Sequence, residues 1–115
     1  MLNIHEVGDA SLDQVYLPIA ESKDVLVDVK ACGICWSDLT YIKVGVIIRQ
    51  PGGVTPLGHE AAGVISYVGD EVEGATVGQR VVINPMMTPS MIGSGGPEGA
   101  FTEQLLVSDA RVGDS

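Results

Sequence analysis

Basic residues and long apolar runs are both scarce in this sequence of 115 residues. Six Lys and Arg stand against fifteen Asp and Glu, which gives a net charge of −9. Nucleic acid and anionic membranes need clustered cations on a partner, so the composition disfavours both. No apolar run approaches the roughly 20 residues that span a bilayer, and the N-terminus lacks a signal-peptide pattern. The sequence therefore predicts a cytoplasmic protein that binds neither nucleic acid nor a membrane.

Cysteine is also scarce, and the two that occur, Cys32 and Cys35, are three positions apart. A zinc ribbon needs a second CxxC, which the sequence lacks. A thioredoxin-like pair needs the long helix and crossover of a βαβ unit, and no such helix follows Cys35. The spacing alone leaves a redox pair and a single metal ligand beside an unrelated cysteine as open interpretations.

Aromatic residues make up only 4% of the chain, so the core must come from Val, Ile, Leu and Ala. Fifteen glycines and six prolines favour many turns and short strands. The length predicts one domain over residues 1–115. Apolar alternation and turn signals predict a mainly β barrel or sandwich, with loops over residues 43–57 and 85–99. The predicted strands cover residues 24–31, 62–68, 80–84 and 100–107, and one short helix covers residues 37–43.

A candidate partner for the cysteines is His59, in the stretch LGHE at residues 57–60. A lone histidine in such a place is most often a polar rim residue. Zinc, however, accepts thiolate and imidazole, and a catalytic site uses three protein ligands and leaves the fourth position open. Ser37 is a candidate helix cap, and a helix start favours the thiolate form of Cys35 that a metal binds. Asp38 is a candidate acceptor for the second imidazole N–H.

Five stretches in order, CGICWSDL, PLGHEAAGVI, VGDEV, VGQRVV and EGAFTEQLLV, carry a family resemblance. Between about residues 25 and 107 the chain resembles the N-terminal, GroES-like catalytic domain of the zinc-dependent medium-chain alcohol dehydrogenases. It is similar to the sorbitol and threonine dehydrogenase-like branch as much as to the alcohol dehydrogenases proper. The resemblance implies a partly open β-barrel with one or two short helices.

The resemblance also implies a set of metal ligands. Cys35 matches the catalytic zinc ligand, whereas Cys32 stands where the family has an ordinary small residue and is expected to be a buried bystander. His59 matches the second ligand. Glu60 matches a glutamate beside the metal that coordinates it in some members. The resemblance places the family's third zinc ligand well beyond residue 115.

Four neighbouring residues receive catalytic or cofactor-related roles from the same resemblance. Asp38 matches the carboxylate that orients the histidine, and Ser37 matches the hydroxyl that contacts the alcohol and begins proton removal. Thr40 stands where many members have a histidine that ends the proton relay. Trp36 replaces the usual Gly or Arg, and either lines the cofactor or substrate cleft or covers the core.

The chain departs from the family pattern in two further respects. The stretch GSGGPEG at residues 93–99 lacks the G-x-G-x-x-G spacing, so NAD(P) is expected to bind only through a cofactor domain that these residues do not contain. The chain is therefore expected to be a piece of a longer protein and inactive alone. The four cysteines of the family's structural zinc site are missing, and the region carries three methionines instead: Met86, Met87 and Met91.

The leading hypothesis is thus the N-terminal catalytic part of a zinc-dependent, NAD(P)-linked alcohol or polyol dehydrogenase. In such an enzyme zinc polarises the substrate oxygen for hydride transfer. The partners are then a small alcohol, polyol or carbonyl substrate, with a homo-oligomer as a further possibility. The alternatives are a metal-free GroES-like binding or assembly module and a thiol oxidoreductase.

Overall fold

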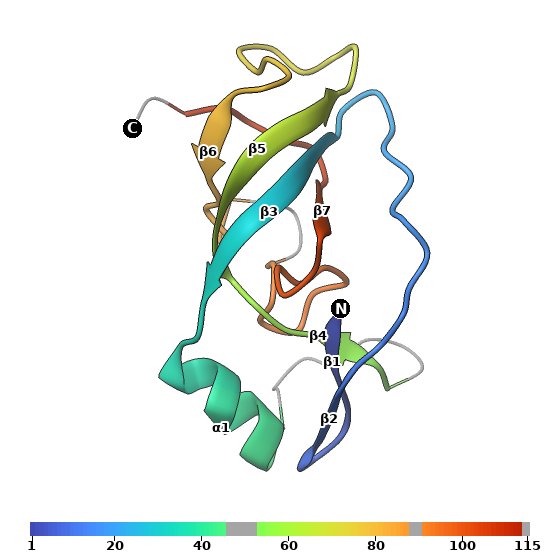
Figure 1. Cartoon of the computed structure of the whole chain (residues 1–115), viewed down its shortest axis with the longest axis vertical. Helices are drawn as coiled ribbons and strands as arrows, with labels where there is room; N and C mark the ends of the chain where they lie inside the picture. Colours follow the sequence, from blue (N-terminus) through green and yellow to red (C-terminus); the bar gives the residue numbers. More distant parts are fainter. Residues whose placement is uncertain (46–52, 88–90, 114–115) are drawn as a thin grey trace.

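The computed structural model of the chain describes residues 1–45, 53–87 and 91–113. Within these ranges the chain forms two antiparallel sheets and one helix, as Figure 1 shows. The larger sheet has the strand order β6-β5-β3-β7, and the smaller sheet has the order β2-β1-β4. The mainly β fold class is therefore confirmed, and neither sheet closes into a barrel in the described part of the chain.

The larger sheet consists of β3 (Val25–Gly33), β5 (Glu60–Val68), β6 (Arg80–Val82) and β7 (Gln104–Val107). All four match predicted strands, but β6 is shorter than the predicted 80–84 and β7 is shorter than the predicted 100–107. Its first predicted residues bond elsewhere, because the backbone N–H groups of Ala100 and Phe101 donate to the carbonyls of the segment before β5. Residues 100–101 therefore bind the segment before β5 and are not part of β7.

Strands β3 and β5 form the long central pair of the fold (Figure 1). Val25 and Val27 on β3 are buried together with Ile65 on β5, as the alternating pattern predicts. The register shifts between Leu26 and Val27 and again between Val29 and Ala31. Such irregularities change the direction in which the following side chains point. The pair ends where Gly33 lies opposite Glu60, and the candidate ligands Cys35, His59 and Glu60 lie at or next to this end. In Figure 1 it is the end from which β3 continues into α1.

The smaller sheet contains β1 (Leu2–Glu6), β2 (Asp9–Leu12) and β4 (Thr55–Pro56). The sequence did not predict it, because these strands are short, polar and without an aromatic or β-branched run. Strand β4 falls in the predicted loop 43–57, of which residues 46–52 lie outside the described ranges, and residues 88–90 of the second predicted loop do as well.

The single helix of the described chain is α1 (Trp36–Val44), close to the predicted 37–43. It follows β3 directly and lies beyond the end of the larger sheet (Figure 1). No helix among the described residues has the length and apolar character needed to cross a membrane.

Asp13, at the end of the β1–β2 hairpin, collects several hydrogen bonds. Its Oδ2 accepts from Asn3 Nδ2 and lies 2.8 Å from His5 Nε2, and its Oδ1 accepts from the Ser11 hydroxyl at 2.8 Å. These hydrogen bonds, with that from Asn3 as the largest cause, lower the pKa of Asp13 from 3.8 to about 2. The carboxylate therefore ties the exit of β2 to both strands of the hairpin.

The substitution Asp13→Asn should change the pH dependence of stability. Because the folded pKa lies below the unfolded value, the ionised carboxylate stabilises the fold above about pH 4 and this contribution is lost as the pH falls toward about 2. Urea unfolding of both proteins from pH 6 to pH 2 measures this. The wild type should be more stable at pH 6, and its advantage should shrink in the acid range. An advantage that stays constant with pH would contradict the assignment.

Candidate metal centre

Cys35 stands at the N-terminus of α1 as the residue that caps the helix. Its backbone is extended (φ −99°, ψ 152°), and its N–H donates to Asp38 Oδ2 at 2.9 Å. Cys35 and Asp38 thus form a capping box, and Asp38 also lies in the first turn, where the helix dipole favours a negative charge. The prediction that Ser37 caps the helix is wrong: Ser37 lies inside the first turn, because the chain becomes helical at Trp36.

His59 is placed by a tightly bonded backbone segment. The carbonyls of Leu57 and Gly58 accept the N–H groups of Phe101 and Ala100 at 3.1 and 2.9 Å. Gly58 has φ +102°, and a Cβ there would come within 2.5 Å of the Phe101 nitrogen, so only glycine fits. These bonds fix the segment immediately before β5, and the side chain of His59, which follows it, is only 16% exposed.

Three side chains with metal-binding atoms meet at this end of the sheet. The Cys35 sulfur, a ring nitrogen of His59 and a carboxylate oxygen of Glu60 all lie within 4.8 Å of one another. We call the side chains of Cys35, His59 and Glu60 the donor group. Within it, His59 Nε2 lies 3.9 Å from Glu60 Oε1. Donor atoms about 3.5 Å apart suit zinc, whose bonds measure roughly 2.0–2.3 Å, so small side-chain rotations would complete the geometry.

The other ring nitrogen of His59 faces Asp38. His59 Nδ1 and Asp38 Oδ1 are 3.4 Å apart, both atoms are buried, and neither has a hydrogen-bond partner in the described part of the chain. A proton on Nδ1, directed at the carboxylate, would satisfy both atoms and leave the lone pair of Nε2 for a metal. This pair of buried atoms is the structural sign that the residues fit a metal ion.

The family assignment follows from a comparison of the whole sequence. The chain matches the model of the alcohol dehydrogenase GroES-like domain over residues 21–114. The chain belongs to this family. Relatives within it include a sorbitol dehydrogenase of Arabidopsis thaliana, 41% identical over 83 residues that cover 69% of this chain and 22% of that protein. A sorbitol dehydrogenase 2 of Saccharomyces cerevisiae is 36% identical over 85% of this chain and 28% of its own length.

Solved structures of the family share the fold. The 2R,3R-butanediol dehydrogenase of Bacillus subtilis superposes with a TM-score of 0.83 at 28% identity, covering 94% of this chain and 38% of that chain. A putative zinc-binding dehydrogenase from Sinorhizobium meliloti, solved with NADP, gives a TM-score of 0.79 at 28% identity over 94% of this chain and 35% of that one. The chain thus spans between about a fifth and two fifths of the length of these relatives.

Cys32, the second cysteine, lies outside the donor group. It is on β3, opposite Ala61, and packs against the buried cluster of Ala61, Ile92 and Leu105. Both cysteines are free thiols, and Cys32 is half-buried, not fully buried as predicted. Burial raises the pKa of the Cys32 thiol, which disfavours the thiolate that both disulfide exchange and zinc require.

The remaining predicted residues lie along α1 but outside the donor group. Ser37 is half-buried in the first turn, one residue before Asp38. Thr40 is exposed, and its hydroxyl donates to the Trp36 carbonyl at 3.1 Å. The Trp36 side chain is 83% exposed, so the interpretation that it covers the core is wrong.

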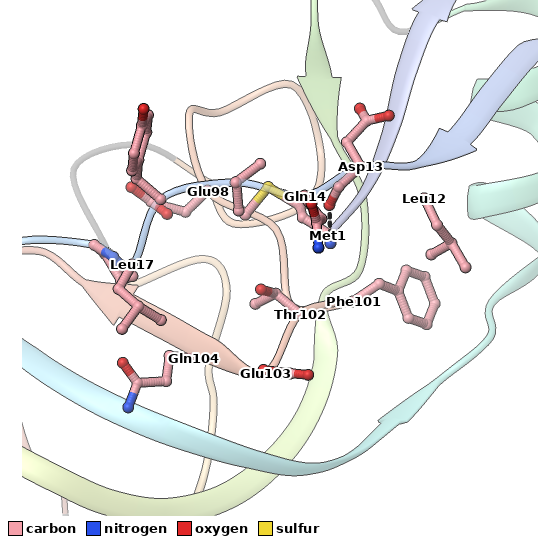
Figure 2. Close-up of a pocket in the computed structure, with 13 residues that line it drawn as sticks. Met1, Leu12, Asp13, Gln14, Leu17, Glu98, Phe101, Thr102, Glu103 and Gln104 are labelled. Atoms are coloured by element: carbon pink, nitrogen blue, oxygen red, sulfur yellow. Dashed lines mark hydrogen bonds between the residues drawn. The ribbon is translucent and has the colours of Figure 1, made fainter.

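One cavity in the described part of the chain lies apart from the candidate metal ligands. Figure 2 shows it between the segment after β2 and the loop before β7. Its volume is about 980 Å³. Its lining includes Leu12, Leu17, Glu98 and Phe101 but no residue of the donor group. Burial raises the pKa of Glu98. The cavity therefore does not serve the candidate metal centre.

Sequence reasoning missed one contact of the centre, the bond between Asp38 and the Cys35 backbone. Its signal was a carboxylate three residues after the cap, which is the spacing of a capping box. This spacing is recognised only when Cys35 is taken as the cap. With Ser37 as the predicted cap, Asp38 is the next residue and the capping box is not seen.

The substitution Asp38→Ala should lower zinc affinity by roughly 10–100-fold, the usual effect of losing a carboxylate that orients a ligand. It removes both the acceptor for His59 and the bond that holds the Cys35 backbone. Competition with a chromophoric chelator measures the affinity. Asp70→Ala, an exposed residue in the turn after β5, is the control and should bind zinc as the wild type does. Equal affinities for both variants would contradict the role of Asp38.

Proposed function

We propose that this chain is the zinc-holding catalytic part of an alcohol or polyol dehydrogenase. The observation that carries the proposal is the meeting of Cys35, His59 and Glu60, with the buried carboxylate of Asp38 behind the histidine. Three protein ligands with an open fourth position are typical of catalytic zinc, whereas structural zinc is enclosed by four. Glu60 would supply the third ligand from within the described chain, in place of the residue expected beyond position 115.

The residues of the chain then have separate tasks. Cys35 and His59 would hold the ion from the start of α1 and the segment before β5, and Glu60 would complete the set from the first residue of β5. When bound, zinc supplies the Lewis acidity that polarises an alcohol or carbonyl oxygen. Asp38 would keep the proton of His59 on Nδ1, so that Nε2 remains a ligand.

Proton transfer would fall to the hydroxyls of α1. Ser37 follows Cys35 by two residues, and its hydroxyl would accept the proton of a substrate alcohol in a hydrogen bond. Thr40 has no group that titrates near neutral pH, and its hydroxyl is bonded to the Trp36 carbonyl. It would therefore pass a proton outward less well than the histidine found there in many members of the family. Trp36, which is exposed, would be free to line the cleft of the cofactor or substrate.

Hydride transfer would need NAD(P), held by a part of the protein outside these 115 residues. The printed sequence offers no dinucleotide fingerprint, and the loop at residues 93–99 contains turns and no helix. The relatives named above include two sorbitol dehydrogenases and a butanediol dehydrogenase, which supports a small alcohol or polyol as the substrate class. The net charge of −9 disfavours a strongly anionic substrate.

The metal-free binding module is the weaker candidate. Such a module would have no use for a thiol, an imidazole and a carboxylate gathered within 4.8 Å, nor for a buried carboxylate that faces the imidazole. A thiol oxidoreductase would need a reactive pair, and the raised pKa of Cys32 works against one.

The two cysteines provide the test of this proposal. Cys35→Ser should reduce zinc affinity by more than the roughly 10–100-fold that an outer-shell residue contributes, since it removes a direct ligand. Cys32→Ser should leave affinity unchanged within error, because Cys32 lies outside the donor group. Elemental analysis and chelator competition on the purified chain measure both variants. Equal loss in the two would indicate a Cys–Cys chelate, and a wild-type chain that binds no zinc would refute the proposal.

A further inference from the structure

Gly33 lies directly opposite Glu60 at the end of the β3–β5 pair. The register continues through Ala31 with Ala62 and Cys32 with Ala61, and it ends with Gly33 and Glu60. Residues directly opposite in an antiparallel pair project to the same face, with Cβ atoms about 5 Å apart. A side chain at position 33 would therefore share the face from which Glu60 reaches the donor group.

The carboxylate of Glu60 occupies the space that a side chain at position 33 would need. A Cβ on Gly33 would lie 2.8 Å from Glu60 Oε2 and 3.4 Å from Glu60 Cβ, and its three nearest neighbours are all atoms of Glu60. The two carboxylate oxygens thus face different groups: Oε2 lies over Gly33, and Oε1 lies 3.9 Å from His59 Nε2.

The backbone of Gly33 does not itself demand glycine. Its φ is not in the left-handed region, unlike that of Gly58, so alanine fits the local backbone. The close contact would be with the end of a flexible side chain that is 53% exposed. An added methyl group would therefore be accommodated by movement of the Glu60 carboxylate, and the strand pairing would remain.

We propose that Gly33 is a positioning residue for the metal centre. Because position 33 has no side chain, the Glu60 carboxylate can occupy the space beside it, and from there it can act as the third ligand. This inference rests on the proposed function, because it assumes that the three donors bind zinc. Little else holds Glu60 in place, since its side chain is largely exposed, whereas His59 and Asp38 are held by burial. A side chain at position 33 would therefore displace the Glu60 carboxylate and leave Cys35 and His59 as the two remaining donors.

The test compares Gly33→Ala with Gly113→Ala. Gly113 is exposed, has no atom within 4 Å of an added Cβ and does not adopt a positive φ, so it reports the effect of a methyl group alone. Gly33→Ala should lower zinc affinity by roughly 10–100-fold, as loss of a supporting residue does. Urea unfolding of the zinc-free proteins should be the same for both. The visible absorption of bound Co²⁺, which reports the number and geometry of ligands, should change only in Gly33→Ala.

A double-mutant cycle shows whether Gly33 acts through Glu60. In a Glu60→Ala background, Gly33→Ala should cause no further loss of zinc affinity and no further change in the Co²⁺ spectrum. Equal losses in both backgrounds would overturn the proposal, and so would wild-type affinity in Gly33→Ala. Unfolding of Gly33→Ala under conditions in which Gly113→Ala stays folded would also overturn it, because glycine would then serve the backbone.

Failure of the role of Gly33 can be distinguished from failure of the proposed function. If the wild-type chain binds no zinc, the function proposed above fails. If the wild type binds zinc through Cys35 and Gly33→Ala binds it equally well, only the role of Gly33 fails.

Discussion

The buried carboxylate of Asp38 connects two segments that would otherwise be independent. One oxygen accepts the backbone N–H of Cys35 at the start of α1, and the other faces the imidazole of His59 at the start of β5. A buried carboxylate oxygen without a partner is costly, and a proton on His59 Nδ1 would supply the partner that Asp38 Oδ1 lacks among the described residues. The orientation of the imidazole would then depend on the position of the start of the helix. The thiol and the imidazole can therefore be presented together before any ion arrives.

The long β3–β5 pair brings those segments together. β3 leads into the Cys35 cap, and β5 begins at Glu60 immediately after His59. The far end of the pair is held by the buried Val25, Val27 and Ile65, so the rigid part of the sheet lies on one side and the ligands on the other. Functional groups placed at the ends of well-packed strands combine a rigid support with access for substrate. The family's fold supplies that support here.

The sequence predicted the elements that have strong periodicity. The alternating valines of β3 and the apolar run of β5 were identified, and the helix was placed within one residue at each end. The candidate metal ligands were identified mainly from the family resemblance, because a thiol and an imidazole 24 residues apart have no diagnostic spacing of their own. The β1–β2 hairpin was missed for lack of an apolar pattern.

The sequence alone could not predict the contacts that determine the detailed geometry of the candidate site. Two register shifts in the β3–β5 pair determine that Gly33 faces Glu60, and no periodic pattern predicts a bulge. The choice of Cys35 over Ser37 as the cap depends on where the strand ends, which local preference for serine does not show. The exposure of Trp36 likewise depends on how α1 leaves the sheet.

X-ray absorption at the zinc edge, on the chain loaded with one equivalent of zinc, tests the central claim most directly. The account predicts a single sulfur at about 2.3 Å and nitrogen or oxygen ligands at roughly 2.0–2.2 Å, from Cys35, His59, Glu60 and a solvent molecule. A spectrum with two sulfur ligands would mean that Cys32 and Cys35 chelate the ion together. A spectrum with no sulfur would place the metal elsewhere and contradict the account.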